Sequence, residues 1–195
     1  GSVVLSGGDS LLSWFNGDEK AASHRAVSAA FAMQNAMKGF SVVSLPNGGT
    51  VELAIKSAAA CGMARRFQVG DSDVQVFDVL AGSLLDKVDA AETLAHRGEI
   101  VVTAETAQML GNEADVLEQR QAGDGSTISV IGRLNRMSDP QPWDAALAPG
   151  ADQVRPWLHP LVYKYINDGQ EQFLSQLRPS VSMFMHFDGI DYDAD

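Results

Sequence analysis

The residues best suited to chemistry stand in the stretch VVLSGGDSLLSWF, residues 3–15, where Asp9 follows two glycines. Two apolar runs flank this Gly-Gly-Asp segment, a pattern that predicts a β-hairpin with Asp9 at its turn. A carboxylate on a rigid hairpin can ligate a divalent cation, because Mg²⁺ is held by one or two carboxylates together with substrate phosphates. The residues alone leave two alternatives open: Asp9 is a turn residue, or it is a metal ligand.

Other motifs with a known chemical mechanism are absent from the sequence. There is no G-x-x-x-x-G-K-[ST] phosphate loop, no G-x-S-x-G nucleophile elbow and no G-x-G-x-x-G after a strand. The four histidines are far apart, and the single cysteine, Cys61, excludes a multi-cysteine zinc site. The aspartates at residues 71, 73 and 124 lie in glycine- or serine-containing turns and are most simply solvated.

The composition is that of a globular protein with an acidic surface. Of the 195 residues, 45% are hydrophobic and 20% are charged, which is sufficient for one substantial core. The formal net charge of -11 repels phosphate backbones and anionic lipids, so nucleic acid and membranes are excluded as expected partners. No apolar run approaches a membrane span, and no basic segment precedes an apolar core at the start. We expect a cytoplasmic protein.

The elements that must position Asp9 follow from periodicity and from residues that start or stop helices. Asp18 is a good N-cap for a helix that runs to about Lys38, with Gly39 as its stop. The methionines of that helix, Met33 and Met37, are expected in the core. Further elements predicted along the chain are a hairpin turning at 70–73, a helix at 83–96, a strand in EIVVT, a short helix in AETAQMLG, a hairpin turning at 123–125 and a strand at 180–187.

Three stretches together resemble class III nucleotide cyclases. The family's metal-site hairpin, G-D-[AS]-[LVF]-[LM]-x-x-[WF], and its following helix are similar to GGDSLLSWFNGDEKAASHRAVSAAFAMQNAM. A strand–helix–strand unit, V-x-G-x-x-V-N-x-A-x-R-L followed by G-E-I-[LV]-[VL]-S, is similar to FDVLAGSLLDKVDAAETLAHRGEIVVTAET. The connector between the two cyclase domains of the soluble adenylyl cyclase type resembles WLHPLVYKYINDGQEQFLSQLRPSVSMFMHFDGID. The similarity runs from about residue 3 to residue 190.

The resemblance implies an α+β fold, the ferredoxin-like palm of this family, with an antiparallel sheet and helices on one face. It divides the chain into a cyclase-like domain at 3–133 that lacks its first strand, a linker at 134–154, a helical connector at 155–177 and, at 178–195, the first strand of a following cyclase domain. The missing opening strand would leave backbone unpaired. We therefore expect the strand at 180–187 to fill the vacant position, within the chain or in a strand-swapped homodimer.

The resemblance also implies a function: the metal-donating half of a tandem nucleotide cyclase that converts ATP to cyclic AMP and pyrophosphate. In such pairs the first domain supplies two metal-binding aspartates, and the second reads the adenine and supplies an Asn and an Arg to the transition state. Asp9 matches the second metal aspartate and is expected to hold Mg²⁺ or Mn²⁺, whereas the first would lie upstream of Val3. The implied partners are the second cyclase domain of the same protein and a nucleotide triphosphate.

Departures from the family pattern follow this division of labour. The Asn position falls on Asp86 and the Arg position on Ala90, so we expect no catalytic residue in this chain. In the last strand the metal-aspartate position falls on His186, with Asp188 two residues later. We expect the isolated chain to be inactive, because each half has lost what its partner provides.

One further departure concerns the substrate phosphates. An Arg that contacts phosphate in some first domains falls on Met63 in this sequence. Strand alternation puts Arg65 on the same face as Met63, so Arg65 is the candidate for this contact. The alternative is that Arg65 and Arg66 are two solvated arginines beside a turn.

Three other functions compete with catalysis. A degenerate regulatory or dimerisation pseudo-cyclase domain would keep the fold with Asp9 as a relic, and the substitution at the phosphate position favours it. A diguanylate-cyclase-like domain partly fits GGDS, but Ser10 replaces the second acidic residue and the connector has no place in that family. A protein-interaction module would carry the hairpin by chance.

Overall fold

The computed structural model describes residues 2–7, 9–140, 148–170, 181, 183 and 189–194. The chain divides into two compact units, one of residues Gly1–Ala64 and Ala81–Pro140 and the other of residues Arg65–Leu80 and Gln141–Asp195. The domain boundaries drawn from the resemblance stay a prediction. No helix in the described part of the chain is long and apolar enough to cross a membrane.

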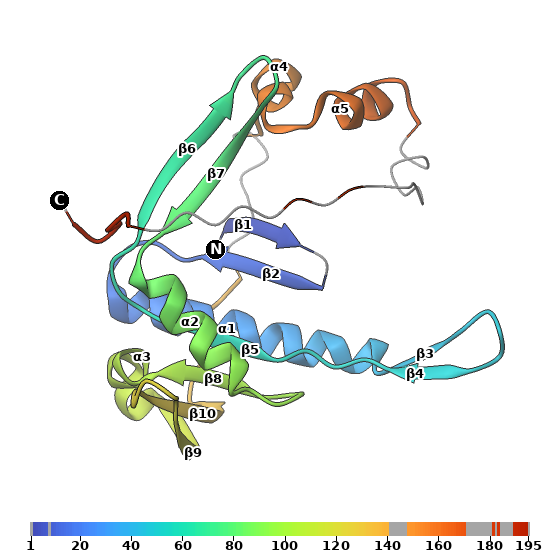
Figure 1. Cartoon of the computed structure of the whole chain (residues 1–195). Helices are drawn as coiled ribbons and strands as arrows, with labels where there is room; N and C mark the ends of the chain where they lie inside the picture. Colours follow the sequence, from blue (N-terminus) through green and yellow to red (C-terminus); the bar gives the residue numbers. More distant parts are fainter. Residues whose placement is uncertain are drawn as a thin grey trace. The chain divides into compact units, whose positions relative to one another are not determined.

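The first unit begins with the predicted hairpin and the helix after it (Figure 1). Strands β1 (Ser2–Gly7) and β2 (Ser10–Trp14) pair antiparallel and lead into α1 (Glu19–Met37). The remaining elements are η1 (Lys38–Phe40), β3 (Val42–Ser44), β4 (Thr50–Glu52), β5 (Ser57–Ala59), α2 (Ser83–Thr93), β8 (Ile100–Thr103), α3 (Ala104–Leu110), η2 (Gly111–Glu113), β9 (Ala114–Gln121) and β10 (Thr127–Leu134).

Helix α1 begins and ends where the sequence predicts, to within one residue. The Asp18 carboxylate accepts a hydrogen bond from the backbone N–H of Ala21 at 3.0 Å, as an N-cap does. At the other end α1 stops at Met37, with Lys38 as its C-cap, and Gly39 lies in the short 3-10 turn η1 that follows. Met33 is 40% exposed, so its predicted place in the core is wrong, and Met37 is only half-buried. The buried stripe of α1 runs through Val27 and Ala30.

A four-stranded mixed sheet forms the centre of the first unit. Its strand order is β5-β8-β10-β9, with β5 parallel to β8 and the other neighbours antiparallel. The α+β class predicted from the sequence is confirmed. The sheet is covered on both faces rather than on one: α1 and α3 pack on one side, while Ala91 of α2 and Ala95, which follows that helix, pack on the other. A parallel pair such as β5–β8 requires a crossover, and α2 lies within it.

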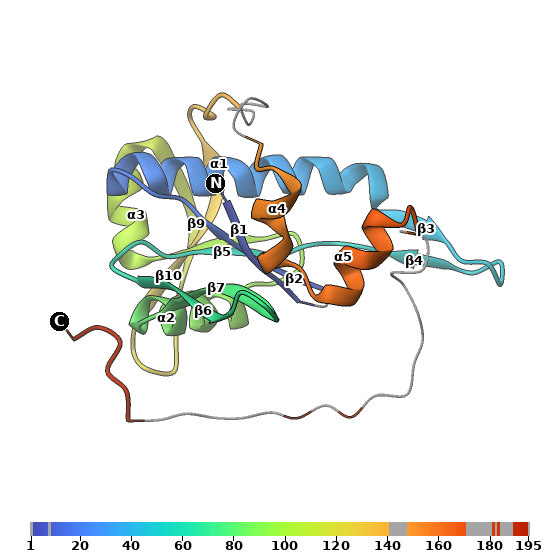
Figure 2. The same ribbon diagram turned by 90° about the horizontal axis from the view of Figure 1, so that it is seen from above.

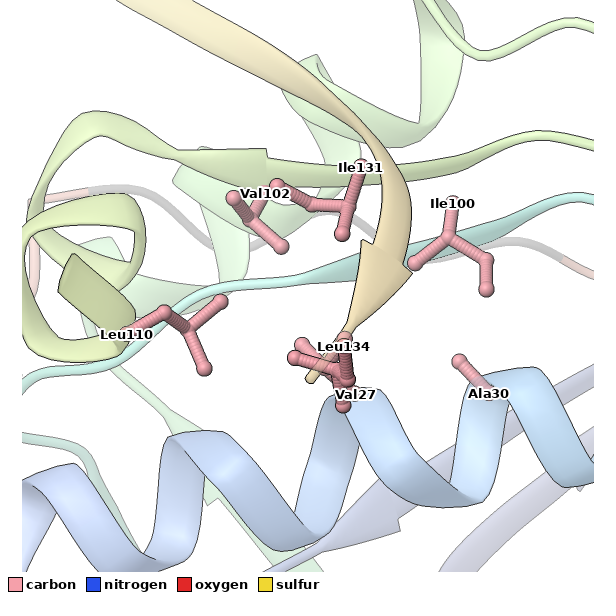
Figure 3. Packing of buried hydrophobic residues seen from close by; sticks show 7 residues of the cluster. All are labelled: Val27, Ala30, Ile100, Val102, Leu110, Ile131 and Leu134. Atoms are coloured by element: carbon pink, nitrogen blue, oxygen red, sulfur yellow. The ribbon is translucent and has the colours of Figure 1, made fainter. Parts of the chain in front are cut away.

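Alternation along the strands assigns buried residues to the two faces. Ile100 and Val102 on β8 face α1 and α3, whereas Val101 between them faces α2. Figure 3 shows the first face, where Val27 and Ala30 of α1 point toward the sheet. That cluster consists of Val27, Ala30, Ile100, Val102, Leu110, Ile131 and Leu134. It ties α1, which follows the Asp9 hairpin, to the central strands.

Two hairpins of the first unit pair outside the central sheet. One is β1–β2, and the other is β3–β4, which extends beyond the C-terminal end of α1 in both views (Figures 1 and 2). The β3–β4 region exposes the apolar side chains Phe40, Val42, Leu45, Val51 and Leu53.

The second unit contains the other predicted hairpin and the described part of the predicted connector. Strands β6 (Arg65–Asp71) and β7 (Gln75–Ala81) turn at 72–74, and the helical pieces are α4 (Ala151–Val154), η4 (Arg155–Trp157) and α5 (Pro160–Asn167). Helix α5 ends at Asn167, two residues before Gly169, whose φ is 66°.

The predicted strand at 180–187 lies largely outside the described residues. Val181 and Met183, the two that are described, belong to no strand and are 98% and 76% exposed. Its role in filling the position of the opening strand stays a prediction.

The β6–β7 hairpin depends on Gly70. Its φ is +119°, and a Cβ there would stand 2.1 Å from the carbonyl oxygen of Gln75, which is backbone and cannot rotate away. We expect Gly70→Ala to destabilise the hairpin by about 2–3 kcal/mol and to raise amide hydrogen exchange across residues 65–81. Gly123→Ala is the matched control, because a Cβ at Gly123 meets no atom within 4 Å. Equal exchange in the two variants would contradict the prediction.

Candidate functional site

Asp9 lies at the tip of the β1–β2 hairpin. The register pairs Gly7 with Ser10, so the turn between the two strands is short and includes Asp9. The side chain of Asp9 is exposed, and its carboxylate is open to a ligand from solvent. The hairpin geometry predicted from the Gly-Gly-Asp segment is therefore confirmed, whereas metal binding by Asp9 stays a prediction.

The segment between the hairpin and α1 is held by a hydrogen bond from Arg25 and by the N-cap of the helix. The guanidinium of Arg25 donates to the carbonyl oxygen of Asn16, one residue before Gly17. Gly17 takes a φ of 112°, a conformation that other residues rarely adopt, and Asp18 then caps α1. These contacts fix the chain between the end of β2 and the start of α1, and so they orient the hairpin that carries Asp9.

A complete metal site is not assembled among the described residues, where no three His, Cys, Asp or Glu side chains come together. Asp9 fits one position of such a site: it offers hard carboxylate oxygens, the ligand type that Mg²⁺ and Mn²⁺ prefer, at an exposed turn. Further ligands would have to come from outside the described residues or from a bound substrate.

The two neighbouring arginines of β6 have different partners, which the sequence did not separate. Arg66 donates to both carboxylate oxygens of Asp78 on β7, with Nε 2.9 Å from each. This contact lowers the pKa of the Asp78 carboxyl and raises the pKa of Arg66. Arg65 instead donates to the backbone oxygens of Tyr192, at 3.1 Å, and of Ala194. Neither arginine is simply solvated, and the acceptors of Arg65 in these contacts are backbone carbonyls rather than a carboxylate.

Two further positions identified from the sequence lie on α2. Asp86 lies exposed in the first turn of α2, and Ala90 is half-buried one turn later. Arg65 and Asp9 belong to different units. His186 and Asp188 lie outside the described residues.

An ion-pair network that the sequence did not reveal holds the loop before β8. The guanidinium of Arg120 on β9 binds Glu99 through two nitrogens, at 2.7 and 2.8 Å, and also donates to the carbonyl oxygen of Leu94 at 2.7 Å. Hydrogen bonds from Arg120 and from the backbone of His96 lower the pKa of Glu99 to about 2. Glu118, an exposed neighbour, accepts from the same guanidinium.

This network predicts a loss of stability in acid. Because the folded-state pKa of Glu99 lies below the unfolded value, its contribution is present above about pH 4.5 and is lost as the pH falls toward 2. We expect Glu99→Gln to cost about 1–2 kcal/mol at pH 7, less than the full pKa shift because the side chain keeps 24% of its surface in water.

The measurement is urea unfolding of both proteins between pH 7 and pH 2. The difference between wild type and Glu99→Gln should shrink toward zero at the acid end. Glu118→Gln serves as the control and should cost less, since Glu118 is 54% exposed. A constant difference across the pH range would contradict the assignment.

Solved structures with a similar fold are adenylyl and guanylyl cyclases. The adenylyl cyclase CyaB from P. aeruginosa gives a TM-score of 0.56 at 16% identity, covering 71% of this chain and 74% of that chain. The guanylate cyclase domain of RhGC from Catenaria anguillulae, solved in complex with GTP, gives 0.53 at 18% identity over 69% and 73%. The guanylyl cyclase Cya2 gives 0.55 at 16% identity over 69% and 71%. No protein-family model and no curated protein matches the sequence.

These similarities establish the fold. The chain has the palm-like fold of nucleotide cyclase catalytic domains, as the resemblance of its hairpin and of its strand–helix–strand unit implied. At this level of identity the activity does not follow from the fold.

Proposed function

We propose that this chain is the metal-donating half of a tandem nucleotide cyclase that converts ATP to cyclic AMP and pyrophosphate. The observation that carries the proposal is Asp9 at the exposed tip of an antiparallel hairpin directly before α1, in a chain with the cyclase fold. The Gly-Asp hairpin and the helix after it match the metal-site pattern of class III cyclases. The partner is a second cyclase domain of the same protein, and the isolated chain is inactive.

The reaction is an intramolecular substitution at phosphorus. The ribose 3′-oxygen forms a bond to the α-phosphorus, the bond from that phosphorus to the oxygen bridging to the β-phosphate breaks, and the hydroxyl proton leaves to a base or to water. Divalent Mg²⁺ or Mn²⁺, when bound, would lower the pKa of the 3′-hydroxyl and neutralise charge on the phosphates. Asp9 would hold the ion through its carboxylate oxygens, and the short β1–β2 turn would limit its movement.

Arg65 is proposed to contact the substrate phosphates. A guanidinium forms two parallel hydrogen bonds to phosphate oxygens and stays charged at every relevant pH. Arg66 is less suited, since Asp78 already occupies it.

The second candidate is a regulatory pseudo-cyclase domain that keeps the fold for pairing. Asp86 and Ala90 on α2 favour it, because neither side chain can stabilise a transition state as Asn and Arg do. In the tandem cyclase the second domain supplies those groups, so their absence here does not separate the two functions. The functions differ at Asp9, which must bind a metal ion in the cyclase and need not do so in the pseudo-cyclase domain.

The test is an assay of the intact tandem protein for cyclic AMP and cyclic GMP with Mg²⁺ or Mn²⁺, in wild type and in Asp9→Asn. Cyclase activity that requires both the metal ion and Asp9 supports the proposal. Activity that is insensitive to Asp9→Asn would make this domain a scaffold, and absence of both products would support the pseudo-cyclase domain.

A further inference from the structure

The last described residues of the chain contact the face of β6 that carries Arg65. Arg65 and Phe67 alternate along β6 and so lie on one face of the strand. The ring of Tyr192 stacks on Phe67, with centroids 6.3 Å apart and planes inclined by 15°. Arg65 donates from Nε to the Tyr192 carbonyl oxygen at 3.1 Å and from Nη2 to that of Ala194. In Figure 1 this C-terminal segment, residues 189–194, lies beside the start of β6.

The C-terminal segment has a defined local structure at this contact. The backbone N–H of Asp193 donates to the Asp191 carboxylate at 3.0 Å, which forms a turn around Tyr192. Gly189, with a φ of 75°, precedes the turn. The turn places the Tyr192 ring and the neighbouring carbonyl groups against the same face of β6.

The contact is of a kind that a phosphate can displace. Carbonyl oxygens are neutral acceptors, whereas phosphate oxygens carry negative charge and can accept two parallel hydrogen bonds from one guanidinium. The segment also carries Asp191 and Asp193, whose negative charge opposes the approach of a polyphosphate while the segment is in place. The stack of Tyr192 on Phe67 is therefore the part of the contact that does not compete with an anion.

We propose that the C-terminal segment 189–194 is an autoinhibitory contact that occupies the phosphate-binding guanidinium of Arg65, with the Tyr192–Phe67 stack as its anchor. The inference rests on the proposed role of Arg65 in contacting substrate phosphates. Polyphosphate and the C-terminal segment cannot bind Arg65 at the same time. Binding of this segment to β6 therefore lowers the fraction of molecules in which Arg65 is free to bind phosphate.

The experiment measures binding of inorganic triphosphate to the full chain by NMR titration at low ionic strength, where electrostatic screening is weak. The variants are Tyr192→Ala, Arg65→Ala and the double variant, with Arg66→Ala as the control that removes an adjacent positive charge. Tyr192 is 36% exposed, so its removal is expected to leave the fold intact. Amide hydrogen exchange of residues 189–194, with and without triphosphate, reports the contact directly.

We expect Tyr192→Ala to tighten triphosphate binding about 3- to 10-fold, the amount that one aromatic stack is worth. The double variant should lose triphosphate binding, and Arg66→Ala should keep most of it. Triphosphate should increase amide hydrogen exchange in residues 189–194 of the wild type.

Two results would overturn the inference in distinguishable ways. If Arg65→Ala weakens binding but Tyr192→Ala leaves it unchanged, Arg65 contacts phosphate and the segment does not block it. If triphosphate binding in Tyr192→Ala is undetectable or independent of Arg65, the phosphate role of Arg65 itself fails, and with it the inhibitory contact. The metal role of Asp9 is tested separately by cyclase activity.

Discussion

Asp9→Asn in the intact tandem protein is expected to lower nucleotide cyclisation by at least about 100-fold. The substitution keeps the size and shape of the side chain at the hairpin tip and removes the charge that would hold the divalent ion. Because Asp9 is exposed and belongs to a short turn, the fold should survive the change. The measurement is initial rate over a range of Mn²⁺ concentrations, together with circular dichroism.

The control for this prediction is Asp124→Asn. Asp124 also stands in a glycine-containing turn between two antiparallel strands, β9 and β10, and its carboxylate accepts local hydrogen bonds from the side chain of Ser126 and from Ser126 N–H, the latter at 2.8 Å. We expect this variant to retain activity. Equal losses in the two variants would mean that turn stability explains the effect, and full activity of Asp9→Asn would make Asp9 a turn residue only.

Leu110→Ala is expected to cause the largest loss of stability, about 3 kcal/mol. Leu110 is 1% exposed at the end of α3 and packs in the cluster that joins α1 to β8 and β10. Truncation leaves a cavity between elements whose backbones are fixed by the sheet, so little collapse can relieve it. Urea unfolding at pH 7 measures the free energy of unfolding directly.

Leu117→Ala is the matched control for Leu110→Ala. Leu117 lies on β9 and is 72% exposed, so its removal should change the free energy of unfolding by less than about 1 kcal/mol. A similar loss in both variants would contradict the assignment of Leu110 to the core. Leu110→Ala should also retain cyclase activity in the tandem protein at low temperature, where most molecules remain folded, because Leu110 contacts no group of the reaction.

Features that depend on neighbouring residues could be predicted from the sequence. The Gly-Gly-Asp turn, the Asp18 cap and the turn at 123–125 were all located, because turn geometry and capping are satisfied by residues two or three positions apart. The end of α1 was also located to within one residue, and Gly39 lies in the 3-10 turn that follows it.

The contacts that connect distant segments could not be predicted. Arg120 and Glu99 are 21 residues apart, and Arg65 and Tyr192 are 127 apart, with no spacing rule to join them. The extent of burial on α1 was predicted only in part: Met33 has the hydrophobicity of a core residue yet is exposed, whereas Val27 and Ala30 pack on the sheet.

The amino-acid sequence was sufficient for the local elements of this protein and for the candidate ligand Asp9, because short-range backbone geometry depends on adjacent side chains. Only the tertiary structure decided that β5 lies parallel to β8 and that both faces of their sheet are covered. It likewise decided that Arg65 meets the chain's last described residues whereas Arg66 meets Asp78. Such pairings minimise the free energy of the whole chain, in which burial and hydrogen bonding between remote segments outweigh local preference.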